Sequence, residues 1–194
     1  MKVCIIVEGC YPYIIGGVSS WVQMLTENTP HVEFIIQALI VSRADSGKFV
    51  YKLPENVTEV REIYLQDDDW VGNGKRRGLL TADEFGALRS LMFGKHIEWG
   101  ELFKMFADPA LSIDRLLMGE DFLHIAQEYY EAQYSRVVFS DFLWTMRSMY
   151  LPLFYVLKNQ PPYADLYHSI ATGYSGVWGS MAKAVHGRPL MISE

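Results

Sequence analysis

Two consecutive glycines, Gly16 and Gly17, lie where a predicted strand at residues 3–7 gives way to a helix. Residues without a Cβ allow positive φ angles and let a diphosphate approach the backbone. The first N–H groups of a helix have no partner inside the helix, so the amides of Val18 and Ser19 are candidate phosphate ligands. In an open parallel sheet, ligands collect beyond the carboxyl ends of the strands, and this turn follows the first strand.

The same residues also allow a purely structural interpretation. The two glycines can form a tight turn into the helix, with Ser19 and Ser20 as its capping residues. The helix itself is predicted from apolar residues that recur at i, i+3, i+4 and i+7. These residues are Val18, Trp21, Val22 and Leu25.

The composition indicates one α/β domain that does not bind nucleic acid. A chain of 194 residues, half of them apolar, can bury one substantial core. Its net charge of −6 argues against a general nucleic-acid or anionic-membrane binder, which needs clustered Lys and Arg. Cys4 and Cys10 have no metal-ligand spacing, and we expect no metal site. With no leader-like or bilayer-spanning stretch, a soluble protein of the reducing cytoplasm is expected.

The first part of the chain predicts further strands. Residues 32–41 are rich in Ile, Val and Phe and predict a second buried strand. Residues 49–53 and 57–65 alternate in polarity and predict a hairpin or two edge strands. Residues 66–78 predict a surface loop, and the adjacent carboxylates of residues 67–69 lack the spacing of a cation site.

A long helical stretch follows and is predicted as an insertion at about residues 81–158. Thr81 is the expected cap of its first helix, which we expect Gly94 and Gly100 to interrupt. Pro152 is expected to kink or divide the last helix. The expected helices span residues 83–107, 112–118, 120–134 and 141–158.

The α/β pattern returns near the end of the chain. Residues 164–169 predict a strand, Thr172 is the expected cap of the next helix, and residues 189–193 predict a last strand. Glycines 173, 176 and 179 form a stripe that suits close packing of this helix on the sheet at least as well as a ligand site. The predicted fold is α/β and Rossmann-like, with a mostly parallel sheet, flanking helices and the helical insertion.

The first turn resembles that of the PelF-like glycosyltransferases, retaining nucleotide-sugar transferases of GT-B fold from Pel exopolysaccharide synthesis. Their pattern, a strand followed by EG-x-YPY-x-x-GGVSSW, is matched by Glu8, Gly9, Tyr11, Pro12, Tyr13, Gly16, Gly17, Val18, Ser19, Ser20 and Trp21. Cys10 stands where that family commonly has threonine. A second match lies at ATGYSG, residues 171–176, followed by GRPLMISE, residues 187–194.

The resemblance implies that the chain is the acceptor-side, N-terminal domain of such an enzyme, inactive without a C-terminal donor-binding domain. The implied reaction transfers a hexose from a UDP-sugar, expected to be UDP-glucose, to a growing exopolysaccharide. The implied partners are the donor with that second domain, a saccharide acceptor and a membrane-embedded polysaccharide synthase complex. The UDP-sugar is a substrate, and no cofactor is implied.

The resemblance also assigns residues. Gly16, Gly17, Val18 and Ser19 would bind the donor diphosphate, whereas no catalytic residue is assigned. A second group would form the substrate cleft, where aromatic faces pack on sugar C–H groups. This group is Glu8, Tyr11, Tyr13, His168, Thr172, Gly173 and Glu194. Structural roles stay open for several of these residues. The tyrosines can rigidify the loop beside Pro12, Glu8 can bond backbone N–H groups of its own loop, and His168 can be a hydrogen-bonded structural residue at a strand end.

Two other functions can be weighed against this one. A dehydrogenase would need G-x-G-x-x-G in the first turn, and Gly9, Gly16 and Gly17 have the wrong spacing. A non-catalytic module that binds polysaccharide or docks on another subunit is the stronger alternative.

Overall fold

The computed structural model describes residues 1–66, 79–94 and 96–193. The chain forms two compact units, and each is described by itself. The first unit is built from two separate stretches, Met1–Asp67 and Asn159–Glu194. The second unit is the intervening stretch Asp68–Lys158.

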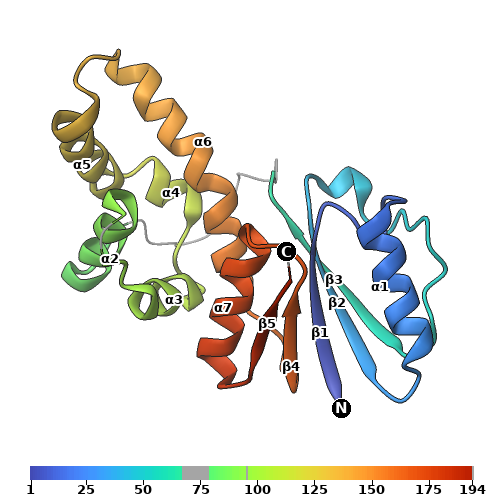
Figure 1. Cartoon of the computed structure of the whole chain (residues 1–194). Helices are drawn as coiled ribbons and strands as arrows, with labels where there is room; N and C mark the ends of the chain where they lie inside the picture. The colour runs from blue at the N-terminus through green and yellow to red at the C-terminus, as the bar shows by residue number, and fades with distance from the viewer. Residues whose placement is uncertain (67–78, 95, 194) are drawn as a thin grey trace. The chain divides into compact units, whose positions relative to one another are not determined.

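The first unit contains a parallel sheet with the strand order β3-β2-β1-β4-β5 (Figure 1). Every strand pairing in this sheet is parallel, which confirms the predicted α/β, Rossmann-like class. β1 is central, and its partners are β2 on one side and β4 on the other. The strands are β1 Lys2–Glu8, β2 Glu33–Ile40, β3 Val57–Tyr64, β4 Leu166–Ser169 and β5 Leu190–Ile192.

Helices α1, Gly17–Asn28, and α7, Tyr174–His186, cover opposite faces of this sheet. Successive residues of a strand point to opposite faces. Ile5 belongs to the buried cluster that includes Val22 of α1. Its neighbour Ile6 lies under α7, because a Cβ added to Gly179 would stand 3.1 Å from Ile6 Cδ1 and 2.8 Å from Leu190 Cδ1. Gly179 thus lets α7 lie close to the strands.

The connection between β2 and β3 differs from the prediction. Residues 49–53 form no strand, so the expected hairpin was wrong, and β3 runs parallel to β2. The connection instead contains a 3-10 turn at Arg43–Asp45 and an irregular return segment. The alternating side chains were misread because Tyr51 and Leu53 pack against the core from this irregular segment.

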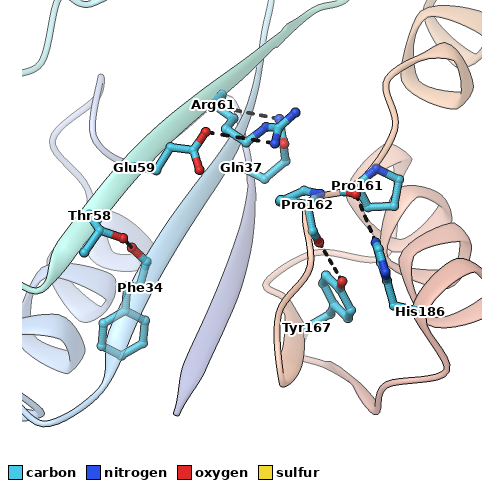
Figure 2. Close-up of polar contacts among 9 residues, drawn as sticks. All are labelled: Phe34, Gln37, Thr58, Glu59, Arg61, Pro161, Pro162, Tyr167 and His186. Carbon is cyan, nitrogen blue, oxygen red and sulfur yellow. Dashed lines mark hydrogen bonds and ion pairs between the residues drawn. The ribbon is translucent and has the colours of Figure 1, made fainter.

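Polar contacts fix the edge strand and the chain that enters β4 (Figure 2). In the view, Thr58 and Arg61 of β3 are joined to β2: the Thr58 hydroxyl donates to the Phe34 carbonyl at 3.3 Å, and Gln37 Nε2 donates to the Arg61 carbonyl at 3.3 Å. On the other side, the Tyr167 hydroxyl donates to the Pro162 carbonyl at 2.7 Å. This last bond holds the backbone just before β4 in place.

The second unit consists of helices over its described residues. Thr81 caps the first helix through a capping box with Glu84. Gly94 ends that helix in the left-handed conformation, whereas Gly100 lies inside the next helix and interrupts nothing. Pro152 lies within the continuous last helix, so the chain is not divided there. The elements are α2 Ala82–Phe93, α3 Trp99–Ala107, α4 Ile113–Leu117, α5 Glu120–Tyr129, a π-helical turn Tyr130–Tyr134 and α6 Phe139–Lys158.

Across the described ranges, no helix combines the length and apolar character that crossing a bilayer requires.

Candidate functional site

The sheet order creates a topological switch point between β1 and β4. The chain leaves β1 through α1 toward β2, and it leaves β4 through α7 in the opposite direction, toward β5. In sheets of this kind, ligands bind in the crevice outside the carboxyl ends of the strands at the switch point. The predicted diphosphate residues lie at this point, because they form the start of α1.

The N-terminus of α1 is open. Gly16 is its N-cap, with φ −176° and ψ 173°, and no side chain caps the helix. The Ser20 amide donates to the Gly16 carbonyl at 2.8 Å, while the amides of Gly17, Val18 and Ser19 find no hydrogen-bond partner among the described residues. A Cβ added at either glycine would meet no atom within 4 Å.

Two parts of the sequence interpretation change here. Neither Gly16 nor Gly17 has a positive φ angle, so the pair is not needed for a left-handed turn. Neither serine caps the helix. The Ser20 hydroxyl lies 3.2 Å from the Tyr51 hydroxyl, and the Ser19 hydroxyl is buried with no hydrogen-bond partner in the described part of the chain. What the two glycines provide is open space beside the first amides of α1.

A pocket of about 270 Å³ adjoins this helix start. Its lining comes from α1 and from the residues that follow β4 and β5, and we call it the switch-point pocket. The lining residues are Gly17, Val18, Trp21, Ile170 and Ser193. Val18 and Trp21, two residues of the apolar pattern that predicted the helix, are 50% and 38% exposed. They line the switch-point pocket and do not belong to the buried face of α1.

His168 lies behind this pocket, in β4. Its Nε2 atom is 2.8 Å from the Ser193 hydroxyl, and its ring meets the Trp21 ring edge-on at a centroid distance of 5.6 Å. The side chain is buried, and burial lowers the pKa of the imidazole. His168 therefore supports two residues of the pocket wall, Trp21 and Ser193, with a neutral ring near pH 7.

Glu8 occupies the second helix N-terminus at this edge. Its carboxylate accepts a hydrogen bond of 3.2 Å from the Ser175 amide of α7, where the helix dipole also favours a negative charge. The N-cap of α7 is Gly173, not the expected Thr172, and Glu8 Oε2 would lie 3.0 Å from a Cβ at Gly173. Glu8 thus bonds a backbone amide, but this amide lies 167 positions away and not in its own loop as one interpretation expected.

The two tyrosines of the first turn have different environments. Tyr11 is fully buried, and its hydroxyl donates to Gln23 Oε1 at 2.8 Å, so its ring lies in the core and not on an open surface. Tyr13 is half-buried and lines a different pocket. Its hydroxyl donates to the carboxylate of Glu62 in β3.

The Glu62 carboxylate, which the sequence did not single out, joins three segments near the strand ends. It accepts hydrogen bonds from the hydroxyls of Tyr13, Ser46 and Tyr64 and from the Gly47 amide. Burial raises its pKa, but these donors outweigh that effect and lower the pKa to about 2. The sequence shows that Tyr13, Ser46 and Tyr64 carry hydroxyl groups. It does not show that these groups all donate to one carboxylate.

The pocket that Tyr13 lines has a volume of about 420 Å³ and lies at the ends of β1 and β2. We call it the Asp45 pocket. It is lined by Gly9, Tyr13, Ile14, Ile40, Val41, Asp45 and Lys48.

Two predicted features lie outside the described residues: Glu194 of the cleft and the carboxylates of residues 67–69. Among the described residues, no group of three or more His, Cys, Asp or Glu side chains could hold a metal ion.

Comparison with known proteins gives one match. Residues 1–194 match the model of a family described as a domain of unknown function, DUF3492. The chain belongs to the DUF3492 family. No curated protein and no solved structure matches it significantly. The DUF3492 assignment covers the whole chain, including both matches to the PelF-like pattern, and is consistent with a glycosyltransferase-like N-terminal domain.

Proposed function

We propose that this DUF3492 chain is the acceptor-side domain of a nucleotide-sugar-dependent glycosyltransferase, with the donor diphosphate bound at the start of α1. The observation that carries the proposal is the set of unpartnered amides of Gly17, Val18 and Ser19 beside a pocket at the switch point. Amides fixed in this way can stabilise the negative charge that develops on a leaving nucleoside diphosphate.

The contrast between the two helix starts supports this assignment. Both α1 and α7 begin at the carboxyl edge of the sheet, and both favour an anion there. At α7 the anion is the chain's own Glu8 carboxylate. At α1 the equivalent position is open, and Gly16 and Gly17 leave room beside it. An external anion such as a diphosphate fits this second position.

The resemblance to PelF-like enzymes supports the finer parts of the proposal. On this basis the donor is a UDP-sugar, UDP-glucose as the first choice, and the acceptor is a growing exopolysaccharide. The reaction retains configuration and takes place in the cytoplasm, beside a membrane-embedded synthase complex. The family's second domain supplies most nucleotide contacts, and a non-catalytic saccharide-binding or docking module is the alternative function.

Titration of the ¹⁵N-labelled chain with sodium pyrophosphate and with UDP tests the diphosphate site. We expect amide shifts at residues 17–19 with both ligands, and loss of these shifts in Gly17→Val, whose Cβ would enter the open space and meet no atom within 4 Å. Gly86→Val is the matched control, because Gly86 is also a helical glycine whose Cβ meets no neighbour. Unchanged pyrophosphate shifts in Gly17→Val would contradict the proposal.

In the full-length protein, the same Gly17→Val substitution is expected to abolish glycosyl transfer from UDP-glucose while the circular dichroism spectrum stays native. Retained transfer would refute the diphosphate role. Saccharide binding by a full-length protein that shows no transfer with any nucleotide sugar would favour the non-catalytic module.

A further inference from the structure

The Asp45 pocket is separate from the switch-point pocket. Its lining comes from the loop after β1, the end of β2 and the turn that follows β2, and it shares no residue with the other pocket. Its volume of about 420 Å³ lies within the range of small-molecule sites, roughly 300–1,000 Å³. Such sites are mostly apolar and contain a few polar groups that orient the ligand.

Two opposite charges supply the polar groups of this pocket. Asp45 and Lys48 are exposed, and neither charged group has a hydrogen bond or ion pair with any described residue. Because the Asp45 carboxylate and the Lys48 ammonium carry opposite charges, the pair has no net charge and selects neither an anionic nor a cationic ligand. A neutral polyol suits both, because its hydroxyls can donate to Asp45 and accept from Lys48.

The remaining lining is apolar and suits the C–H face of a sugar ring. The Tyr13 ring lies beside Ile14 and Val41, of which the latter two are 57% and 55% exposed. Aromatic and aliphatic surfaces of this kind pack against sugar C–H groups, while the polar groups bind hydroxyls. Gly9, another lining residue, has φ +62° and nothing within 4 Å of an added Cβ, so it leaves space in the pocket.

The walls are held before any ligand binds. Glu62 accepts hydrogen bonds from Tyr13 on one wall and from Ser46 and Gly47, which lie between the two charged residues of the other wall. The Tyr13 ring also meets the Phe49 ring edge-on at 5.4 Å. Side chains that are already held in place lose less conformational entropy when a ligand binds than mobile side chains do.

We propose that the Asp45 pocket is a binding site for a neutral saccharide, with Asp45 and Lys48 as its hydrogen-bonding pair and Tyr13 as its packing surface. The role of this saccharide as acceptor rests on the proposed function. The binding site itself does not.

The test is an NMR titration of the ¹⁵N-labelled chain with three neutral probes: cellotriose, maltotriose and tri-N-acetylchitotriose. At least one probe is expected to shift amides of the pocket. Asp45→Asn and Lys48→Met are each expected to weaken its binding about tenfold or more, as loss of a hydrogen bond to a charged group does. Glu55→Gln and Lys52→Met, exposed residues of the same connection, serve as matched controls and should leave binding unchanged.

Two outcomes overturn the inference: no probe shifts the pocket amides, or both Asp45→Asn and Lys48→Met bind the probe as the natural chain does. A parallel pyrophosphate titration separates this inference from the proposed function. Gly17→Val should abolish the pyrophosphate shifts and leave the saccharide shifts intact. Saccharide binding without pyrophosphate binding contradicts the proposed function alone, and the reverse result contradicts the saccharide site alone.

Discussion

At the residue scale, Glu8 acts as the cap of a helix that begins 166 residues later in the chain. We expect Glu8→Ala to lower the free energy of unfolding by about 1–2 kcal/mol, because it removes both a hydrogen bond and a favourable charge at the start of α7. Glu8→Gln should lose only the charge, about 0.3–1 kcal/mol. Urea unfolding measures both, with exposed Glu55→Ala as the control that should change little.

Glu62 leads to a prediction about pH. Its pKa is about 2 in the folded chain, against an ordinary value of 4.5. The unfolded chain therefore binds more protons between these values, so the contribution of Glu62 is complete above about pH 4.5 and is lost as the pH falls toward 2. With allowance for solvent screening, the loss should be on the order of 1 kcal/mol.

Urea unfolding at pH 3 and pH 6 measures this loss in the natural chain and in Glu62→Gln. The difference in stability between the two pH values should be smaller in the variant. Glu59→Gln, on the same strand, should keep the natural pH dependence. An equal pH dependence in Glu62→Gln and the natural chain would contradict the assigned role of the carboxylate.

Single residues were the part of the site least accessible from the sequence. The pattern correctly placed Gly16 and Gly17 at the junction where a helix begins after a strand, because this relation is local. The partner of Glu8 and three of the four donors to Glu62 come from distant segments, which no local pattern brings together. Tyr11 gave a misleading signal, since an aromatic residue in a turn can equally belong to the core.

At the scale of elements, the packing of α7 on the sheet depends on Gly179. We expect Gly179→Val to lower the free energy of unfolding by about 1–3 kcal/mol, because its Cβ would stand 2.8 Å from Leu190 Cδ1 and 3.1 Å from Ile6 Cδ1. Gly176→Ala is the comparison: its nearest neighbour would be the Ala171 carbonyl oxygen at 3.5 Å, and alanine favours a helix. Thermal unfolding should show a lower midpoint for the first variant only.

The spacing of apolar residues predicted the helices and the buried strands. It did not predict where helices are interrupted or where the chain is irregular. Thr81 was correctly predicted as a cap, since a hydroxyl followed three residues later by Glu84 is a local signal. Gly100 fails to break its helix because it lies in the first turn, where the backbone has few internal bonds to lose. Thr172 looked like a cap, but the N-cap lies one position later, at Gly173, and the Glu8 carboxylate accepts from the Ser175 amide.

At the scale of the whole molecule, the chain alone should bind a nucleotide sugar weakly. One helix N-terminus contributes about 0.3–2 kcal/mol to anion binding, whereas micromolar affinity needs about 8 kcal/mol. Isothermal titration of UDP-glucose into the chain is therefore expected to give a dissociation constant above ~10 μM. Tighter binding would mean that the donor site does not need a second domain.

The fold class was accessible from the sequence because short apolar runs alternate with helical patterns on both sides of the long helical stretch. Composition alone favoured one core, but the helical insertion predicted at about residues 81–158 falls within the stretch Asp68–Lys158 that forms the second compact unit. The strand order had to come from the structure, which places β4 beside β1 although the second unit lies between them in sequence.

The pairing of β1 with β4 has a consequence for biosynthesis. Val3 pairs with Leu166, so one side of the central strand must wait for a partner made 163 positions later. At ~5–20 residues per second, the ribosome needs roughly 8 to 33 s to reach it. During that interval the nascent β1 presents unpaired backbone groups beside Ile and Val side chains, a surface prone to aggregation. A chaperone that shields the emerging N-terminal strands would therefore raise the yield of folded chain.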